Sequence, residues 1–286
     1  MVMSGNGASP TVYKRQLGLA LTSLREDAGK TPEAVAEVLE CSVAKIRRIE
    51  AGDVGVRASE LKDLLEFLGA TKQTRKHLEE LAREARKRSP RTAYGSVLPD
   101  FFRKFFNLEQ IAAEVLRYHS DLIPGQLQTP DYARALLEAN PLHDEQELDR
   151  LVQARQARQS RLTDGESSQR LHAVLHEAAV RTVVGGPDVM RDQLLHLRKL
   201  AAMQNVTVQV IPFSAGAHAA SGFPFVLLRF PDNLGNVVYL ENLTTAASID
   251  APKHVNEYEM VFRQAVGAAL SPAKSSALLA TVAGEL

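Results

Sequence analysis

The sequence predicts an α+β protein, with an N-terminal all-α domain of five helices and a C-terminal mixed α/β domain whose one sheet is covered by helices. Two observations predict this division. Apolar residues recur at helical spacing up to about residue 88, whereas from Arg170 onward short apolar runs typical of strands alternate with helical stretches. The length of 286 residues accommodates two domains of ordinary size.

The chain is expected to divide into four segments. Residues 1–12, which are rich in Ser, Gly and Asn, are expected to form a disordered tail. Residues 13–88 contain the helical domain, and residues 89–100 form a linker that opens with Ser-Pro-Arg. The mixed domain occupies residues 101–286 and is long enough to bury a core of its own.

Residues 31–52 have the pattern of a helix-turn-helix, in which two short helices flank a turn. Thr31 is a favourable N-cap for the first helix, and Ser42 is one for the second. In the second helix Ile46 and Ile49 face inward together with Val43. The opposite face carries Ala44, Lys45, Arg47 and Arg48. A recognition helix lays such a basic face in the major groove, so the pattern predicts DNA binding.

The remaining helices of this domain complete the set of five. One is expected over residues 13–28, before the helix-turn-helix. Two follow it, the first over residues 59–68 with Gly69 as a stop signal and the second beginning after the N-cap Thr71.

Several short runs resemble the lambda-repressor-like, or Xre-type, DNA-binding domain. They are Val35-Ala36, Ser42, Lys45-Ile46 and Arg48-Ile49-Glu50-Ala51-Gly52. Together with the pattern above, the resemblance implies DNA contacts by Thr31, Ser42, Val43, Ala44, Lys45, Arg47 and Arg48. Arg48 is expected to bond guanine and Ala44 to meet a thymine methyl, whereas Lys45 and Arg47 are expected to hold phosphates. In the alternative interpretation, these charges only solvate an exposed face.

The sequence departs from the family pattern at two positions. Pro32 stands where the family usually has Gln, which touches phosphate and steadies the base-reading side chains. Glu40 stands in the turn where Gly is common, and a left-handed backbone costs more at Glu than at Gly. Both changes bear on the details of base reading and leave the predicted fold intact.

Charge is balanced overall but not along the chain. Up to Pro90 there are 16 Lys and Arg against 13 Asp and Glu, and beyond it there are 18 against 21. A modestly basic N-terminal domain suits a protein that reads bases more than one that coats DNA electrostatically. The single cysteine, Cys41, excludes an internal disulfide, and its place in the turn predicts a small buried hydrophobe.

The sequence shows no run of 18 apolar residues and no signal-peptide pattern. A cytoplasmic location and no membrane association are therefore expected, and the lone thiol fits a reducing compartment.

The C-terminal domain is expected to open with a helix. Phe101, Phe102, Phe105 and Phe106 have helical spacing, which Leu108, Ile111, Val115 and Leu116 continue. This spacing favours core or dimer packing over stacking on nucleic acid. Two further helices are expected, one capped by Thr129 and a long polar one over residues 145–162.

The sheet is expected in the last third of the chain. Residues 171–177 and 206–212 form strands separated by a helix over 188–203, which indicates a parallel pair. Residues 223–230 and 237–243 then form a hairpin. Helices over 252–270 and after Ser271-Pro272 close the chain.

The C-terminal domain carries a second resemblance. Its runs are Pro124-Gly125-Gln126-Leu127-Gln128-Thr129, His176-Glu177-Ala178, Val184-Gly185-Gly186-Pro187, Val208-Gln209-Val210-Ile211-Pro212-Phe213, Gly216-Ala217-His218, Tyr239-Leu240-Glu241 and Ala269-Leu270-Ser271-Pro272. They resemble the uncharacterised domain that follows an Xre-type head in actinomycete antitoxin-like regulators. The resemblance implies regulation with a small partner protein encoded nearby, and it implies no ligand or catalytic residue.

Candidate chemistry in this domain is sparse. His172 and His176 lie on one face of a strand at roughly 13 Å, too far apart for one zinc ion. Neither paired carboxylates, a nucleophile elbow nor a metal cluster is recognisable, so no catalytic residue, metal or cofactor is expected and the protein is not expected to be an enzyme. Gly216, His218 and Glu241 are the best candidates for contacting a ligand or partner.

Two interpretations of function remain open at the level of sequence. In the first, a homodimeric repressor binds operator DNA and uses its C-terminal domain to dimerise and to bind a small partner protein. In the alternative, that domain senses a small molecule or, less plausibly, is an enzyme tethered to DNA. A deep pocket with convergent polar groups near His218 and Glu241 favours the sensor, and a large apolar patch favours the partner protein.

Overall fold

The protein consists of two compact units, residues 1–92 and residues 93–286, which we call the head and the body. The computed structural model describes residues 10–86, 98, 100–139, 144–163, 169–230 and 235–286. The expected tail up to residue 9 and nearly all of the expected linker lie outside these residues. Within the described part, Leu98 is buried in the body and a helix begins at Asp100.

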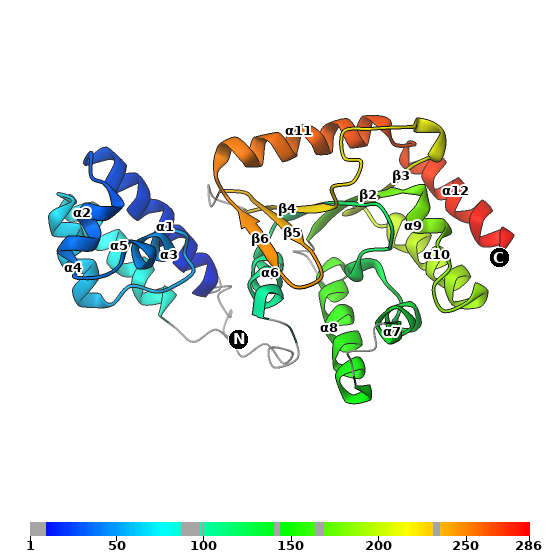
Figure 1. Cartoon of the computed structure of the whole chain (residues 1–286), viewed down its shortest axis with the longest axis horizontal. Coiled ribbons are helices and arrows are strands. Elements are labelled where there is room, and N and C mark those ends of the chain that lie inside the picture. Colours follow the sequence, from blue (N-terminus) through cyan, green and yellow to red (C-terminus); the bar gives the residue numbers. More distant parts are fainter. Residues whose placement is uncertain (1–9, 87–97, 99, 140–143, 164–168, 231–234) are drawn as a thin grey trace, which may run out of the picture. The chain divides into compact units, whose positions relative to one another are not determined.

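The head contains five helices, which confirms the prediction (Figure 1). They are α1 (Pro10–Asp27), α2 (Pro32–Val38), α3 (Val43–Glu50), α4 (Ala58–Phe67) and α5 (Lys72–Ala85). Residues 10–12, which the sequence places in the tail, belong to α1. The helix-turn-helix is formed by α2 and α3.

Local sequence signals set the limits of these helices. The side-chain oxygens of Thr31 and Ser42 accept hydrogen bonds from the backbone N–H groups of Ala34 and Lys45, at 3.3 and 3.2 Å. Both caps satisfy a donor that the first turn of a helix leaves open. In the turn, Glu40 adopts a φ of 47°, a left-handed conformation that no other described non-glycine residue has.

The core of the head depends on a close crossing of α1 and α3. Leu17 and Leu21 of α1 are buried with Ile46 and Ile49 of α3. Gly18 lies at the crossing, where a β-carbon would stand 2.3 Å from the carbonyl oxygen of Glu50. Only glycine fits there without moving one helix. Cys41 is half-buried beside this core, so its predicted role as a buried hydrophobe holds only in part.

The body contains a six-stranded sheet in the order β3-β2-β1-β4-β5-β6. Its strands are β1 (Glu114–His119), β2 (Arg170–His176), β3 (Val206–Ile211), β4 (Phe225–Arg229), β5 (Val237–Glu241) and β6 (Ala246–Ile249). The strands β1, β2 and β3 are parallel, and β4, β5 and β6 continue the sheet by antiparallel pairing. The predicted parallel pair and hairpin are both present.

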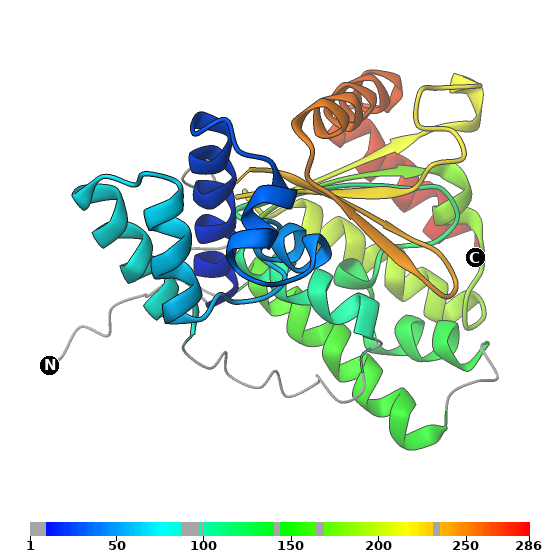
Figure 2. The same ribbon diagram turned by 60° about the vertical axis from the view of Figure 1, so that its left-hand side comes forward.

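Helices cover both faces of the sheet (Figures 1 and 2). One face packs against α11 (Pro252–Ala268), which lies across it. The other face packs against α6 (Asp100–Ile111), the 3₁₀ helix η1 (Gly125–Leu127), α7 (Pro130–Glu138), α8 (Glu145–Thr163), α9 (Glu177–Arg181), α10 (Pro187–Ala201) and α12 (Pro272–Glu285). The short 3₁₀ helix η2 (Phe213–Ala215) follows β3. The mixed α/β fold predicted for the body is thus confirmed.

The structure corrects one element of the predicted fold. Val115 and Leu116, expected to prolong the aromatic helix, lie in β1, because α6 ends at Ile111. Residues 115, 117 and 119 point to one face of the sheet and 116 and 118 to the other, so the spacing is that of a strand. Pairing with β2 and β4 on both sides favours the strand. The edge strand β6 was also missed by the sequence analysis.

The junction of α11 and α12 covers the outer edge of the sheet. Val210 of β3 accepts a hydrogen bond from Leu270 N–H and donates its own N–H to Ser275 Oγ, both at 2.9 Å. No single described helix is long and apolar enough to cross a membrane, and α11 and α12, bent by 66° at their break, reach that threshold only together. Both helices bury apolar side chains within the body.

Candidate DNA-binding surface and body cavity

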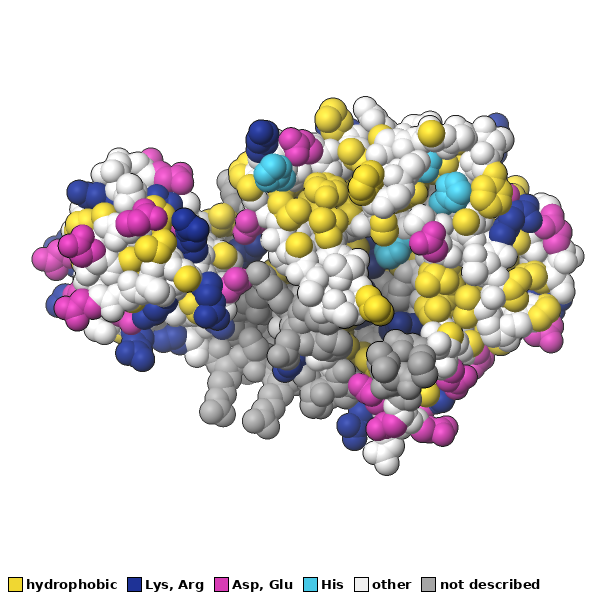
Figure 3. All heavy atoms as spheres, in the orientation of Figure 1, with side chains coloured by type: hydrophobic (Ala, Val, Ile, Leu, Met, Phe, Trp, Pro, Cys, Tyr) yellow, Lys and Arg dark blue, Asp and Glu magenta, His cyan; other side chains and the backbone are white. Residues whose placement is uncertain are grey.

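The helix α3 presents a basic face to solvent. Ala44, Arg47 and Arg48 are exposed, as are the two cap residues Thr31 and Ser42. Arg47 Nη2 lies 3.9 Å from Glu33 Oε1 in the first turn of α2, so the N-terminus of α2 adjoins this face. Figure 3 shows Lys and Arg among acidic side chains on the head, which fits its modest basic excess. We call the five exposed residues Thr31, Ser42, Ala44, Arg47 and Arg48 the α3 surface.

Two of the residues expected to contact DNA, Lys45 and Val43, make contacts within the head. Lys45 is half-buried, and its Nζ lies 2.7 Å from Glu60 Oε1 at the start of α4. The hydrogen bond from Lys45 lowers the pKa of Glu60 below its ordinary value. Val43 is half-buried and packs against the core of the head. The structure therefore places Lys45 and Val43 beside the α3 surface rather than fully on it.

Glu50, in the run shared with the Xre-type pattern, holds α3 to α1. Arg25 Nε donates to Glu50 Oε1 at 2.6 Å, and Arg25 Nη2 donates to Oε2 at 3.2 Å. This bidentate pair is largely shielded from water, and it raises the pKa of Arg25 above its ordinary value. Glu50 thus attaches the C-terminal end of α3, close to Arg48, to α1.

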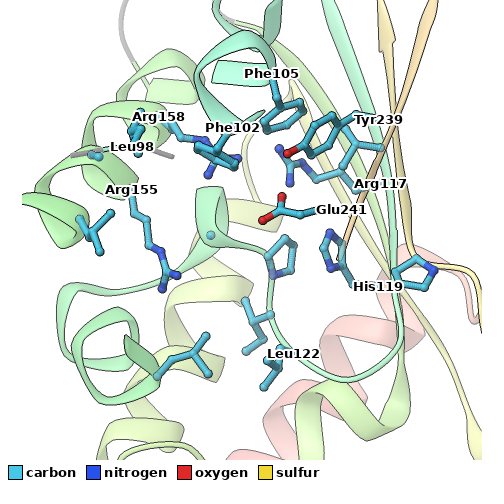
Figure 4. A pocket seen from close by; sticks show the side chains of 18 of the residues that line it. Leu98, Phe102, Phe105, Arg117, His119, Leu122, Arg155, Arg158, Tyr239 and Glu241 are labelled. Carbon is cyan, nitrogen blue, oxygen red and sulfur yellow. The ribbon is translucent and has the colours of Figure 1, made fainter. Parts of the chain in front are cut away.

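A cavity of about 530 Å³ opens in the body (Figure 4). It lies between the sheet strands β1 and β5 and the helices α6, α7 and α8. Its volume is typical of small-molecule binding sites. Its apolar lining comprises Leu98, Phe102, Phe105, Leu122, Ile123, Pro124, Leu136, Leu137, Leu151, Ala154, Pro224, Phe225 and Val226. Its polar lining comprises Arg117, His119, Glu147, Arg155, Arg158, Tyr239, Glu241 and Asn242.

A buried ion cluster holds one wall of this cavity. Arg158 Nε and Nη2 donate to the two oxygens of Glu109 at 2.5 and 2.9 Å, and Arg117 Nη2 also donates to Glu109. Burial alone would raise the pKa of Glu109, but the two guanidinium groups hold it below its ordinary value. The carboxylate is therefore ionised, and removing it would leave two buried cations unpaired.

Aromatic rings continue the same wall. The ring of Phe105 stacks on that of Tyr239 with centroids 4.1 Å apart. The guanidinium carbons of Arg117 and Arg158 lie 5.7 and 5.5 Å from the Phe105 centroid. Cations and aromatic rings thus pack against one another along this wall.

Three buried polar atoms on the cavity lining have no hydrogen-bond partner among the described residues. They are Arg117 Nε, His119 Nε2 and Tyr239 Oη. Burial and the neighbouring arginines lower the pKa of His119 to about 3, so its imidazole is neutral at physiological pH. Burial raises the pKa of Tyr239 above its ordinary value, so its hydroxyl keeps its proton. Unpaired buried groups are rare in folded proteins and call for an explanation.

Opposite charges face the cavity from two walls (Figure 4). On α8, Arg155 Nη1 donates to Gln128 Oε1 at 2.7 Å, but within the described residues no carboxylate lies within 4 Å of its guanidinium. Burial lowers the pKa of Arg155 to about 10, which leaves it charged at neutral pH. On β5, the Glu241 side chain is exposed, and partial desolvation by the surrounding groups raises its pKa, although the nearby hydroxyl and arginines oppose this effect.

The Pro-Gly-Gln-Leu-Gln-Thr run, residues 124–129, lines the cavity with its first two residues and packs against α8. Gln126 and Gln128 are buried and donate to the carbonyl oxygens of Arg158 and Ile123, at 3.3 and 2.7 Å. A β-carbon on Gly125 would stand 3.3 Å from Arg158 Nη1. This run is therefore explained by the packing of α8 at the cavity.

Two domain families match the chain. Residues 16–78 match a helix-turn-helix domain, and residues 102–281 match a family described as a domain of unknown function (DUF5753). The second match spans more than half of the sequence. The chain belongs to the DUF5753 family. No curated protein and no solved structure matches it.

The DUF5753 body does not bring the three weakly predicted contact residues together. Glu241 lines the cavity, whereas His218 Nε2 lies 3.4 Å from Tyr118 Oη, on the opposite face of the sheet. Gly216 is exposed, with a φ of 66° in the turn after η2. His218 and Gly216 thus belong to a separate loop region.

The histidines of β2 take structural positions in the DUF5753 body. His172 Nε2 lies 2.8 Å from Gln209 Oε1, and its ring meets Phe262 of α11 edge-on. His176 Nδ1 accepts a hydrogen bond from Ala178 N–H at the start of α9. Among the described residues, no three His, Cys, Asp or Glu side chains are grouped as metal ligands.

Most of the cavity lining was not predicted from the sequence. Arg117, His119 and Tyr239 meet because β1 pairs with β4 and β4 with β5, which aligns Arg117, Val226 and Tyr239 across the sheet. Two signals were present in the sequence: the alternation of Leu116 and Tyr118 with the polar residues Arg117 and His119, and two arginines three residues apart on α8.

Proposed function

We propose that this chain is an Xre-type, sequence-specific transcriptional regulator that reads DNA with α3. The observation that carries the proposal is the α3 surface, where Arg47 and Arg48 are exposed within a helix-turn-helix domain. The proposal assigns Arg48 to a guanine edge, Ala44 to a thymine methyl and Arg47 to a phosphate. Lys45 would join the phosphate contacts only after leaving Glu60.

Binding to selected duplexes tests this assignment. A binding site is first selected from a random duplex library, and affinities for that site and for random DNA are then measured by fluorescence anisotropy. We expect Arg48→Ala to weaken specific binding by about 1–3 kcal/mol and random binding much less. Equal losses on both duplexes would contradict base reading.

A matched control comes from α5. Arg83 is an exposed arginine of the same domain that lies outside α2 and α3. Arg83→Ala is expected to leave the specific affinity and the specificity ratio close to those of the unmodified protein. A loss as large as that of Arg48→Ala would indicate a general effect of charge.

We further propose that the regulator acts as a homodimeric repressor. Support comes from the geometry of helix-turn-helix proteins, which as dimers bind half-sites about one helical turn apart. Footprinting of the selected site is expected to reveal two related half-sites. A single unrepeated half-site would contradict the dimer, and increased transcription of an adjoining reporter would contradict repression.

Two roles are proposed for the body, and each has its own supporting observation. An antitoxin-like role with a small partner protein is supported by exposed aromatic residues at the loop after β3, where Phe213 and Phe223 are 55% and 66% exposed. Figure 3 also shows apolar side chains on the outer surface of the body. The sensor role is supported by the cavity.

The two roles give different results in one experiment. The tagged full-length protein is purified from its native cells, and the DNA shift is repeated with its co-purifying proteins and, separately, with a metabolite extract. A small protein that changes the shift supports the partner role. A shift changed by metabolites alone supports the sensor.

A further inference from the structure

We propose that the body cavity binds a largely apolar organic acid, whose anionic group is held by Arg155 and whose apolar part lies against the aromatic wall of Phe102 and Phe105. This inference deepens the sensor role of the body. It requires neither DNA binding nor a partner protein.

The lining matches a molecule with a large apolar part. Apolar side chains from α6, α7 and α8 surround the cavity, and its volume of about 530 Å³ suits a drug-sized ligand. The stacked rings of Phe105 and Tyr239, with Phe102 beside Phe105, form the aromatic side of the cavity (Figure 4). A polar ligand such as a sugar would leave these surfaces uncompensated.

The open polar groups favour an acceptor-rich head group. Arg117 Nε and the Arg155 guanidinium can only donate hydrogen bonds. A carboxylate or sulfonate offers several acceptor lone pairs and would satisfy such donors. The buried Nε of Arg117, which lacks a partner among the described residues, is thereby explained.

Arg155 differs from the other two arginines of the cavity. Arg117 and Arg158 both donate to Glu109, whereas among the described residues Arg155 donates only to the neutral acceptors Gln128 Oε1 and Ala133 O. Arg155 therefore has no direct carboxylate partner in the described part of the body, and the carboxylate charge that acts on it is that of Glu241 on the facing wall. The anionic group of a ligand could therefore form an ion pair with the Arg155 guanidinium.

Substitution of Glu241 should change ligand affinity in the direction opposite to substitution of Arg155. Its carboxylate borders the same cavity and would repel an anionic ligand. Neutralising Glu241 should therefore strengthen the binding of an anion, whereas neutralising Arg155 should weaken it. A cavity that lost its shape in both variants would lose affinity in both.

The test uses 8-anilinonaphthalene-1-sulfonate, an apolar aromatic anion whose fluorescence rises in apolar sites, titrated into the full-length protein without DNA. We expect saturable binding, a loss of affinity of about tenfold or more for Arg155→Met, and tighter binding for Glu241→Gln. The control Arg150→Met removes an exposed arginine of the same helix outside the cavity and is expected to change nothing.

Two further variants separate charge from folding. Arg155→Lys keeps the positive charge and should retain most of the affinity, even if Arg155→Met fails to fold. Leu151→Trp fills the cavity without changing any charge and should abolish binding. Circular dichroism establishes that each variant is folded.

Competition with neutral and anionic probes defines the ligand class. Decanoate is expected to displace the fluorophore at concentrations about tenfold lower than decanol, because both share a chain length and differ in charge. Equal displacement by both, unchanged binding in Arg155→Met, or weaker binding in Glu241→Gln would overturn the proposal. Fluorophore binding without any DNA binding would overturn the proposed DNA recognition alone.

Discussion

Arginine occupies opposite environments in the two units. In the head, Arg47 and Arg48 extend from α3 into solvent, whereas in the body Arg117 and Arg158 are buried around one carboxylate. An exposed guanidinium costs little to maintain and is available to a polyanion such as DNA. A buried guanidinium must be paired, so its removal or the removal of its partner disturbs the fold.

Because of this contrast, mutations of arginine and its partners are expected to have different effects in the two units. Substitutions of Arg47 and Arg48 on the α3 surface are expected to change DNA affinity and leave the fold intact. Substitutions at the buried cluster are expected to unfold the body first and to change binding only as a consequence. Arg155 lies between these extremes, since it is half-buried and has only neutral hydrogen-bond partners among the described residues.

The largest expected effect is on the stability of the body. Glu109→Gln leaves Arg117 and Arg158 without their shared carboxylate and should lower the free energy of unfolding by about 3–5 kcal/mol. Urea denaturation followed by circular dichroism measures the change. Glu138→Gln, at an exposed carboxylate paired with Arg134, should cost less than about 1 kcal/mol. Similar losses at both sites would contradict the contrast between buried and exposed pairs.

The next effect is a dependence of stability on pH. The folded-state pKa of His119, about 3, lies below its ordinary 6.5, so the unfolded chain takes up the proton first as the pH falls. The body should therefore lose stability below pH 6.5, by up to about 1.4 kcal/mol per pH unit from this group. His119→Gln should reduce that slope, as measured by denaturation between pH 6.5 and 4.5. An unchanged slope would rule out a buried neutral His119.

A third prediction concerns the crossing of α1 and α3 in the head. Gly18→Ala would place a methyl group 2.3 Å from the Glu50 carbonyl oxygen and should destabilise the head by about 1–3 kcal/mol. Thermal unfolding measures the loss. Gly55→Ala serves as the control, because no atom lies within 4 Å of a β-carbon built there. Tolerance of alanine at Gly18 would contradict the close crossing.

The smallest expected effect is at Lys45. Its ion pair with Glu60 is partly exposed, so Lys45→Ala should lower the stability of the head by only about 0.2–1 kcal/mol. Lys62→Ala, at an exposed lysine of α4, is the matched control. A loss of several kcal/mol would contradict this account, in which the Lys45–Glu60 pair contributes little to the stability of the head.

Locally coded features were predictable from the sequence. The caps Thr31 and Ser42 and the apolar spacing around Ile46 set the helix-turn-helix within a few turns of chain, so the five helices of the head agree with the prediction. The parallel pair of β2 and β3 followed in the same way from a strand, a helix and a strand in sequence.

Features that depend on distant segments were not predictable. Arg117 and Tyr239, about 120 residues apart, meet only through the register of three strands. The strand β1 itself was mistaken for helix, because its apolar residues continue the spacing of the aromatic run before it. Arg155 and Arg158 lie on a helix that the sequence identified only as long and polar, with no indication of a cavity beside it.

The dependence of DNA affinity on salt tests the division between exposed and buried arginines most directly. The affinity for the selected duplex is measured over a range of salt concentrations for the unmodified protein, Arg47→Ala and Arg155→Met. Arg47→Ala should reduce the slope of log affinity against log salt by about 1, because one phosphate contact is lost. Arg155→Met should leave the slope unchanged. A reduced slope for Arg155→Met, or an unchanged one for Arg47→Ala, would contradict recognition of DNA by the exposed face of α3.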